Sequence, residues 1–309
     1  MKKNRERALI ASLALAALFL GTTTNASSLA GTFKAPEEAV QALAEAIETP
    51  VETRSEAMFG KDWRELLESG DAAADREDAL KVRAMILEKV SFKDLEGNRK
   101  VVLIGKGEWP FPVPLVKEGE LWRFDVAAGA VELLNRRIGR NEILTLATLH
   151  AYVDAQREYH AAGRDGNPPA YARKLRSDAG LHNGLHWSSA PGEPESPVGD
   201  LAAQASMDSP TEGDAPGPEP YHGYFYRTLT AQGKSAPGGE KSYLDAKGLM
   251  TGGYAAIAWP ARYGKGGVMT FIVNQQGIVF QKDLGAETER AAPAIAAYDP
   301  DETWNPTGD

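Results

Sequence analysis

The chain has 309 residues, no cysteine and a formal net charge of −9 at pH 7. Without cysteine, neither a disulfide nor a lipidated cysteine can form, so the fold must depend on ordinary hydrophobic cores. The acidic balance argues against nucleic acid or anionic lipid as the partner. The length favours two domains over one.

The first residues predict an exported protein. The basic segment MKKNRER is followed by the apolar segment ALIASLALAALFLG, and the chain then turns polar, with small residues around Thr24 to Ala26. This order is typical of a secretory signal peptide over residues 1–26, cleaved after Ala26. The alternative is an uncleaved membrane anchor, because the apolar segment is long for a signal peptide. We expect a periplasmic or secreted protein whose mature chain has no stable membrane insertion.

An N-terminal α+β domain is expected over residues 33–135. The segment FKAPEEAVQALAEAI has the apolar spacing of an amphipathic helix, and further helices are expected around Trp63 and around Leu80 and Leu87. From Val90 the pattern becomes that of two hairpins, VSFKDLEGNRKVVLIG and PFPVPLVKEGELWRFDV. This order, in which helices precede a small antiparallel meander, is similar to that of a cystatin-like or nuclear-transport-factor-like cone.

The second domain is expected over residues 136–309, as a long helix followed by an antiparallel meander. Gly139 costs roughly 1 kcal/mol inside a helix, so the pattern predicts a kink or break there. Residues 188–220 are rich in Pro, Gly, Ser and acids, which predicts a long surface excursion. The β-rich segments YHGYFYRTL, GGYAAIAWPARYG and GVMTFIVNQQGIVFQKDL follow, and the last turns at Asn274–Gly277 to close a hairpin.

Several distinctive strings resemble one bacterial family. They are WPFPVPLV at Trp109, WRFD at Trp122, NRRIGRNE at Asn135, YVDAQREY at Tyr152, YHGYFYRTLTAQG at Tyr221, APGG at Ala236 and GVMTFIVNQQGIVFQKDLG at Gly267. Together they are similar to the "domain of unknown function 2950" family, over nearly the whole mature chain. The resemblance implies an exported bacterial protein with no established activity.

The C-terminal half is also similar to the globular head of type IV pilins and pseudopilins. The likeness lies in a helix carrying NE and AQREYH, a polar loop, YARKL, a tryptophan and a meander ending in TFIVNQQGIVF. Pilins have an apolar stem ahead of that helix, whereas NRRIGR stands here. The likeness therefore implies a shared head fold and contacts at the cell envelope, without assembly by the pilin route.

Catalytic and metal-binding signatures are weak throughout the sequence. The tripeptide Gly233–Ser235 looks like the end of a phosphate-binding loop, but the required upstream glycine would fall at Thr228. Asp165 and Asn167 lack the further oxygen ligands of a calcium loop. His182 and His186 are separated by a glycine and have no acid at ligand spacing. We expect no metal and no cofactor.

The best binding candidates are two tryptophans with a neighbouring phenylalanine, and an arginine pair with nearby acids. The aromatic rings could form a platform for a glycan or peptide, and the arginines could hold an anionic group. In the alternative interpretation, which we favour, the tryptophans fill the core and the arginines join the two domains through acids. The candidate residues are Trp109, Phe111, Trp122, Asp125, Arg136, Arg137 and Glu142.

Two functions remain open from the sequence. The first is a non-catalytic envelope protein that binds another envelope protein or a glycan, or serves a structural role. The alternative is an envelope hydrolase that uses Asp125, Glu108 or Glu132 as a general base in the first domain.

Overall fold

The computed structural model describes residues 31–48, 52–61, 63, 72–163, 168–189, 195–198 and 219–308. The chain divides into two compact units, Met1–Arg136 and Arg137–Asp309. The predicted signal peptide, the Asp165 and Asn167 loop and most of the excursion at 188–220 lie outside the described residues.

Three described helices precede the first sheet: α1 (Pro36–Glu48), α2 (Glu52–Phe59) and α4 (Ala72–Glu88). Helix α1 begins with Pro36 at a position where no backbone donor is needed, and the carboxylate of Glu38 accepts the backbone N–H of Lys34 at 3.0 Å. Helix α4 buries Ala79, Val82 and Ile86, whereas Leu80 and Leu87 lie on its exposed side.

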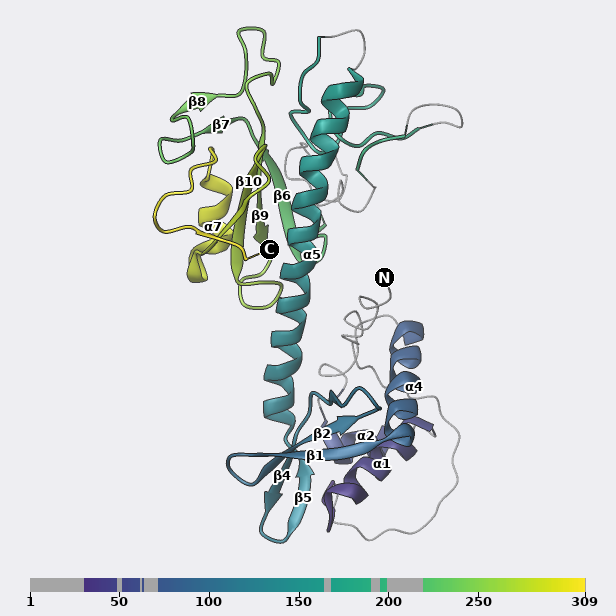
Figure 1. The fold of residues 1–309 in the computed structure, drawn as a ribbon. Helices are drawn as coiled ribbons and strands as arrows, with labels where there is room; N and C mark the ends of the chain where they lie inside the picture. The colour runs from purple at the N-terminus through teal and green to yellow at the C-terminus, as the bar shows by residue number, and fades with distance from the viewer. Residues whose placement is uncertain are drawn as a thin grey trace. The chain divides into compact units, whose positions relative to one another are not determined.

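The first sheet is antiparallel and follows the two predicted hairpins (Figure 1). Its strand order is β1-β2-β4-β5, and β3 also pairs with β2. The turn between β1 and β2 places Gly97 and Asn98 at positive φ, which glycine and asparagine tolerate best. The strands are β1 (Val90–Leu95), β2 (Arg99–Ile104), β3 (Trp109–Pro110), β4 (Leu115–Glu118) and β5 (Leu121–Phe124).

One face of this sheet makes the core of the first unit with the three helices. Alternate residues of the strands point into that core, as the side chains of Val102, Ile104, Leu115 and Phe124 do. Phe59 of α2 reaches the same core, and its ring lies 5.1 Å from that of Phe124. Burial of these side chains is the main favourable contribution to the stability of this unit.

Helix α5 (Val126–Ala162) runs without interruption for 37 residues, so a break at Gly139 is wrong. A single glycine costs only about 1 kcal/mol, which packing along the rest of the helix offsets. The helix starts in the first unit, where Leu133 packs on the core, and continues in the second, where Leu149 and Val153 are buried.

The second unit contains a five-stranded antiparallel sheet in the order β12-β11-β10-β9-β6. The predicted turn at Asn274–Gly277 joins β10 to β11, and Gly277 has a positive φ of 81°. These strands are β6 (Tyr224–Leu229), β9 (Ala255–Pro260), β10 (Met269–Asn274), β11 (Val279–Asp283) and β12 (Asn305–Pro306). A separate pair joins β7 (Ala231–Gln232) to β8 (Lys241–Ser242).

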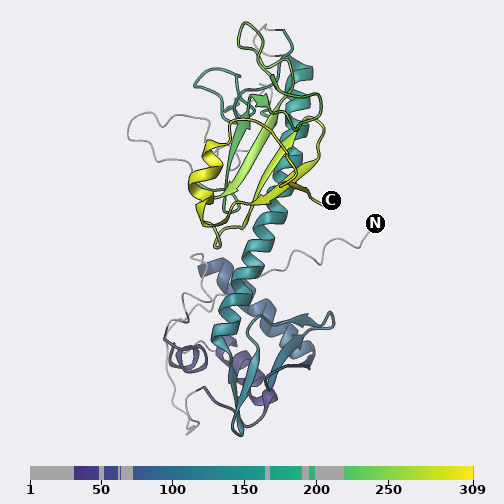
Figure 2. The same cartoon turned by 90° about the vertical axis from the view of Figure 1, so that its left-hand side faces the viewer.

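Strand β9, which lies between β10 and β6, is buried on both faces, because every residue from Ala255 to Pro260 is buried. Within this unit α5 lies on one side of the sheet and the short helix α7 (Thr288–Ala291) on the other (Figures 1 and 2). α7 is flanked by the 3-10 turns η1 (Gly285–Glu287) and η2 (Ala292–Ala294). The predicted α+β class is confirmed: helices, an antiparallel sheet, a long helix and a five-stranded antiparallel sheet follow in order.

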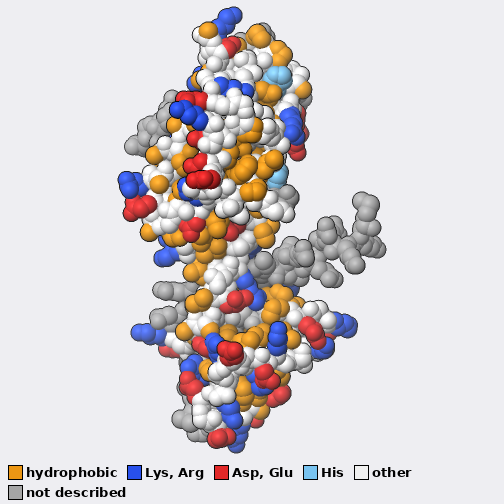
Figure 3. Space-filling model, turned by 60° about the vertical axis from the view of Figure 1, so that its left-hand side comes forward, with side chains coloured by type: hydrophobic (Ala, Val, Ile, Leu, Met, Phe, Trp, Pro, Cys, Tyr) orange, Lys and Arg blue, Asp and Glu red, His pale blue; other side chains and the backbone are white. Residues whose placement is uncertain are grey.

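Hydrophobic side chains also reach the surface, as patches among charged residues (Figure 3). Over the described part of the chain, no helix is both long and apolar enough to cross a membrane.

Candidate functional site

Trp109 lies in a small cluster with two charged side chains of the same unit. The guanidinium of Arg136 is 5.1 Å from the centre of the Trp109 ring, a cation–π geometry. The Nε of Arg136 donates to Glu132 Oε1 at 2.7 Å, one helical turn earlier on α5. Strand β3 and the first turns of α5 therefore position a Trp–Arg–Glu cluster.

The other two aromatic candidates belong to the core. Phe111 is only 2% exposed, and Trp122 packs against the same hydrophobic cluster as Trp109. The backbone of Trp122 exchanges two hydrogen bonds with Phe33, and Lys100 Nζ lies 5.7 Å from its ring centre. The three rings therefore line the core of the first unit, and Phe111 presents almost no surface to a ligand.

The acidic candidates of the first unit are engaged in local bonds. Asp125 precedes α5 and its Oδ1 accepts the backbone N–H of Ala128 at 3.2 Å, which is the geometry of an N-cap. Glu108 accepts a hydrogen bond from Lys89 at 2.7 Å, and this bond lowers the pKa of the Glu108 carboxyl. A carboxylate works best as a general base at neutral pH when its pKa is raised. The pKa of Glu108 is instead lowered, which does not suit that role.

Arg137 and Glu142, which lie in the second unit, have different surroundings. Arg137 is exposed, whereas Glu142 Oε1 accepts the backbone N–H groups of Val268 at 2.9 Å and Met269 at 3.0 Å. The structure thus brings Arg136 to Glu132 and Trp109, and Glu142 to the start of β10.

The contacts around Glu142 extend to two neighbours that the sequence did not single out. Asn141 Nδ2 donates to the carbonyl of Gly266 at 2.8 Å, and the Tyr224 hydroxyl donates to the carbonyl of Met269 at 2.9 Å. Burial, together with the charge of Glu142, raises the pKa of Tyr224. A Cβ at Gly267 would lie 2.0 Å from the Tyr224 hydroxyl, so only glycine fits there. These bonds fix α5 to the segment before β10.

The chain matches one family of proteins over most of its length. The family model described as "Protein of unknown function (DUF2950)" matches residues 30–307. The chain belongs to this family. No curated protein and no solved structure matches it, so the expected likeness to a pilin head has no support from a known structure.

The weak motifs of this DUF2950 family member have local structural partners. The amide of Ser235 donates to Asp299 Oδ1 at 2.7 Å, so a carboxylate of the chain itself occupies the loop that looked like a phosphate site. His186 Nδ1 is 2.9 Å from the carbonyl of Val198, and the ring of His182 packs against Trp187 at 4.8 Å. The described residues contain no group of three or more His, Cys, Asp or Glu side chains that could hold a metal ion.

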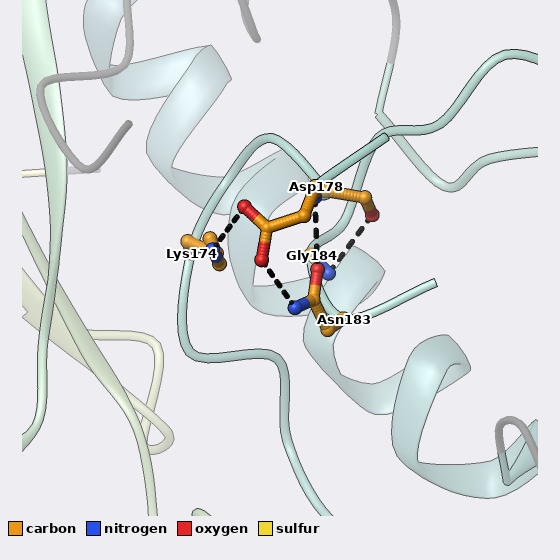
Figure 4. A network of polar contacts seen from close by, with 5 residues as sticks. Lys174, Asp178, Asn183 and Gly184 are labelled. Atoms are coloured by element: carbon orange, nitrogen blue, oxygen red, sulfur yellow. Dashed lines mark hydrogen bonds and ion pairs between the residues drawn. The ribbon is translucent and has the colours of Figure 1, made fainter. Parts of the chain in front are cut away.

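A polar network joins residues between Lys174 and Gly184, in the chain segment that follows α5 in the family member (Figure 4). Asp178 Oδ1 accepts from Lys174 Nζ at 2.6 Å, and Asp178 Oδ2 accepts from Asn183 Nδ2 at 2.8 Å. The backbone N–H of Asp178 donates in turn to Asn183 Oδ1 at 3.0 Å. The hydrogen bond from Lys174, followed by that from Asn183, lowers the pKa of Asp178. No spacing rule pointed to this network.

Proposed function

We propose that the protein is exported and acts in the cell envelope as a non-catalytic accessory protein that binds an envelope protein or a glycan. Export rests on the basic, apolar and small-residue order of residues 1–26. The order of a long helix and then an antiparallel sheet, as in pilin heads, is consistent with a role in envelope contacts.

The observation that carries the proposal is the engagement of every carboxylate considered as a general base. Asp125 caps α5, Glu132 holds Arg136, and Glu108 pairs with Lys89. A general base must lie within hydrogen-bond reach of the proton that it takes from the substrate. These three side chains serve instead to position a helix end, an arginine and a turn.

The most suitable binding surface in the first unit is the Trp109–Arg136 cluster. A tryptophan edge offers apolar area, and the arginine above it can donate to a polar or anionic group. Because Arg136 is already held by Glu132, it loses little side-chain entropy when a partner binds.

The proposal is tested with the mature chain, Ser27–Asp309, in two assays. Insoluble cell-wall glycan is used for co-sedimentation, and detergent-solubilised envelope protein for cross-linking. The Trp109→Ala and Arg136→Ala variants should lose binding, whereas the control Arg290→Ala, an exposed arginine paired with Glu287, should keep it. Normal binding by both first-unit variants would remove this surface from the proposal.

The hydrolase alternative is tested on the same polymers with the variants Glu108→Gln, Asp125→Asn and Glu132→Gln. Each substitution keeps the shape of the side chain and removes its charge. We expect no turnover by the unmodified chain. Hydrolysis of an envelope polymer that one of the three substitutions abolishes, without loss of binding, would overturn the non-catalytic proposal.

A further inference from the structure

Asn183 is the only asparagine of the chain that is followed by glycine. In such a pair the backbone nitrogen of the glycine can attack the side-chain carbonyl carbon of the asparagine and expel ammonia. The resulting five-membered succinimide is then opened by water to aspartate or isoaspartate. Glycine favours this reaction because it has no Cβ to hinder the approach.

The structure holds both ends of the Asn183 side chain. Its Nδ2 donates to Asp178 Oδ2 at 2.8 Å, and its Oδ1 accepts the backbone N–H of Asp178 at 3.0 Å (Figure 4). Asp178 is itself held through its other oxygen by Lys174 at 2.6 Å. To become the electrophile, the amide must rotate away from at least one of these partners.

The attacking nitrogen is held as well. The backbone N–H of Gly184 donates to Ser177 Oγ at 2.9 Å. Gly184 is buried, and a Cβ there would lie 2.6 Å from the carbonyl carbon of Arg176, so the backbone around it has little room to turn. The adjacent residue Leu185 is tied by its N–H to the carbonyl of Lys174 at 3.1 Å.

From these contacts we propose that Asn183 is a site of spontaneous deamidation, and that opening of the 177–184 loop sets its rate. The closed loop ties down the nucleophile and the electrophile together. If opening and closing are fast, the rate follows the fraction of molecules in the open state.

The reaction is irreversible in its effect on the loop. Aspartate at position 183 has no N–H to donate to Asp178, and it places a second negative charge beside that carboxylate. Like charges at this distance repel each other, so the loop that protected the site no longer closes in the same way. In an exported protein, the fraction of molecules deamidated at Asn183 would therefore rise with the time since synthesis.

The proposal is tested by incubating the full chain at mildly alkaline pH and following the Asn183 peptide by mass spectrometry. The native chain should deamidate at least about tenfold more slowly than the same chain in urea, since each tenfold corresponds to about 1.4 kcal/mol of protection. The other asparagines in the same digest serve as internal references. Equal rates in the native and unfolded chains, or no reaction at Asn183 in urea, would overturn the proposal.

Variants separate the loop from global stability. Ser177→Ala and Asp178→Ala should each accelerate the native reaction by about threefold to tenfold, as expected for losing one or two net hydrogen bonds. Ser242→Ala, which removes an exposed serine bonded to Leu244, is the matched control and should leave the rate unchanged. Thermal melting must stay close to that of the unmodified chain. Unchanged rates in both loop variants would mean that these bonds do not control the site.

Discussion

Asp125 illustrates how a residue that attracts a functional interpretation can have a structural role. Its carboxylate accepts the N–H of Ala128, one of the backbone donors that the first turn of α5 leaves without a helical partner. An aspartate directly before a helical run is a recognised cap signal. This contact could therefore be inferred from the sequence.

Replacement of Asp125 by alanine should lower the free energy of unfolding of the first unit by about 1 kcal/mol, because the cap is lost. Asp125→Asn keeps an acceptor oxygen at the same place and should be close to neutral. Urea unfolding followed by tryptophan fluorescence measures both variants. Equal loss of stability in both would point to the charge of Asp125, and no loss in either would remove its capping role.

The pH dependence of the 177–184 loop follows from Asp178. Its pKa is lowered in the folded state, mainly by Lys174, so the bonded carboxylate stabilises the loop at pH values above the unfolded pKa of about 3.9. This contribution is lost as the pH falls through the lower, folded pKa. An NMR titration of the Asp178 carboxyl should have its midpoint below the ordinary value, and Lys174→Ala should move that midpoint up. A midpoint that Lys174→Ala leaves in place would contradict the assigned cause.

The contacts of Glu142 could not be predicted from the sequence. Its partners Val268 and Met269 are 126 and 127 positions away, and they bond through backbone groups that carry no side-chain signal. The sequence can suggest only nearby partners, such as Arg136 and Arg137. A contact across such a separation is known only once the fold is known.

At the scale of elements, the hairpins were predictable because their turns are chemically specified. Gly97 with Asn98, Gly119 and Gly277 all have positive φ, and each stands between two β-prone runs. The continuity of α5 was not predictable, because the cost of one glycine is small beside packing interactions that are distant in sequence. Local rules therefore located the hairpin turns better than they predicted the continuity of the long helix.

The continuous helix makes a sharp prediction for its two glycines. A Cβ at Gly139 meets nothing within 4 Å, so Gly139→Ala should raise the free energy of unfolding by about 0.5–1 kcal/mol. At Gly129 a Cβ would lie 2.8 Å from a methyl carbon of Val113, so Gly129→Ala should destabilise despite the same gain in helix propensity. Thermal melting with circular dichroism compares the pair.

The glycine pair also separates a continuous helix from a broken one. If α5 were kinked at Gly139, alanine would oppose the required backbone conformation and would lower the melting temperature. A fall in stability for Gly139→Ala would therefore contradict the continuous helix. A gain for Gly129→Ala would contradict the close packing against Val113.

At the scale of the whole molecule, the two units have separate hydrophobic cores, and no residue described by the structure belongs to both. The first core draws its buried members from between Ala39 and Phe124, and the second from between Leu149 and Trp304. Periodicity indicates the buried face of α1, whereas α4 has apolar residues on two sides, and only the side with Val82 and Ile86 is buried.

Separate cores predict separate responses to matched substitutions. Ile47→Val in the first core and Ile272→Val in the second should each cost about 0.5–1.5 kcal/mol, since both side chains are fully buried. Native-state hydrogen exchange should show lower protection in β2 for the first variant and in β10 for the second. Equal loss of protection in both sheets for either variant would mean that the chain unfolds as one cooperative unit.

The two hydrogen bonds between Phe33 and Trp122 have a consequence for solubility. They occupy backbone groups of β5 at the edge of the first sheet, where an unpaired strand would otherwise offer its N–H and C=O groups to another chain. Trimming at the expected point after Ala26 leaves Phe33 in place. Proteolysis a few residues further along would uncover the strand edge, and the damaged protein would then tend to aggregate through it.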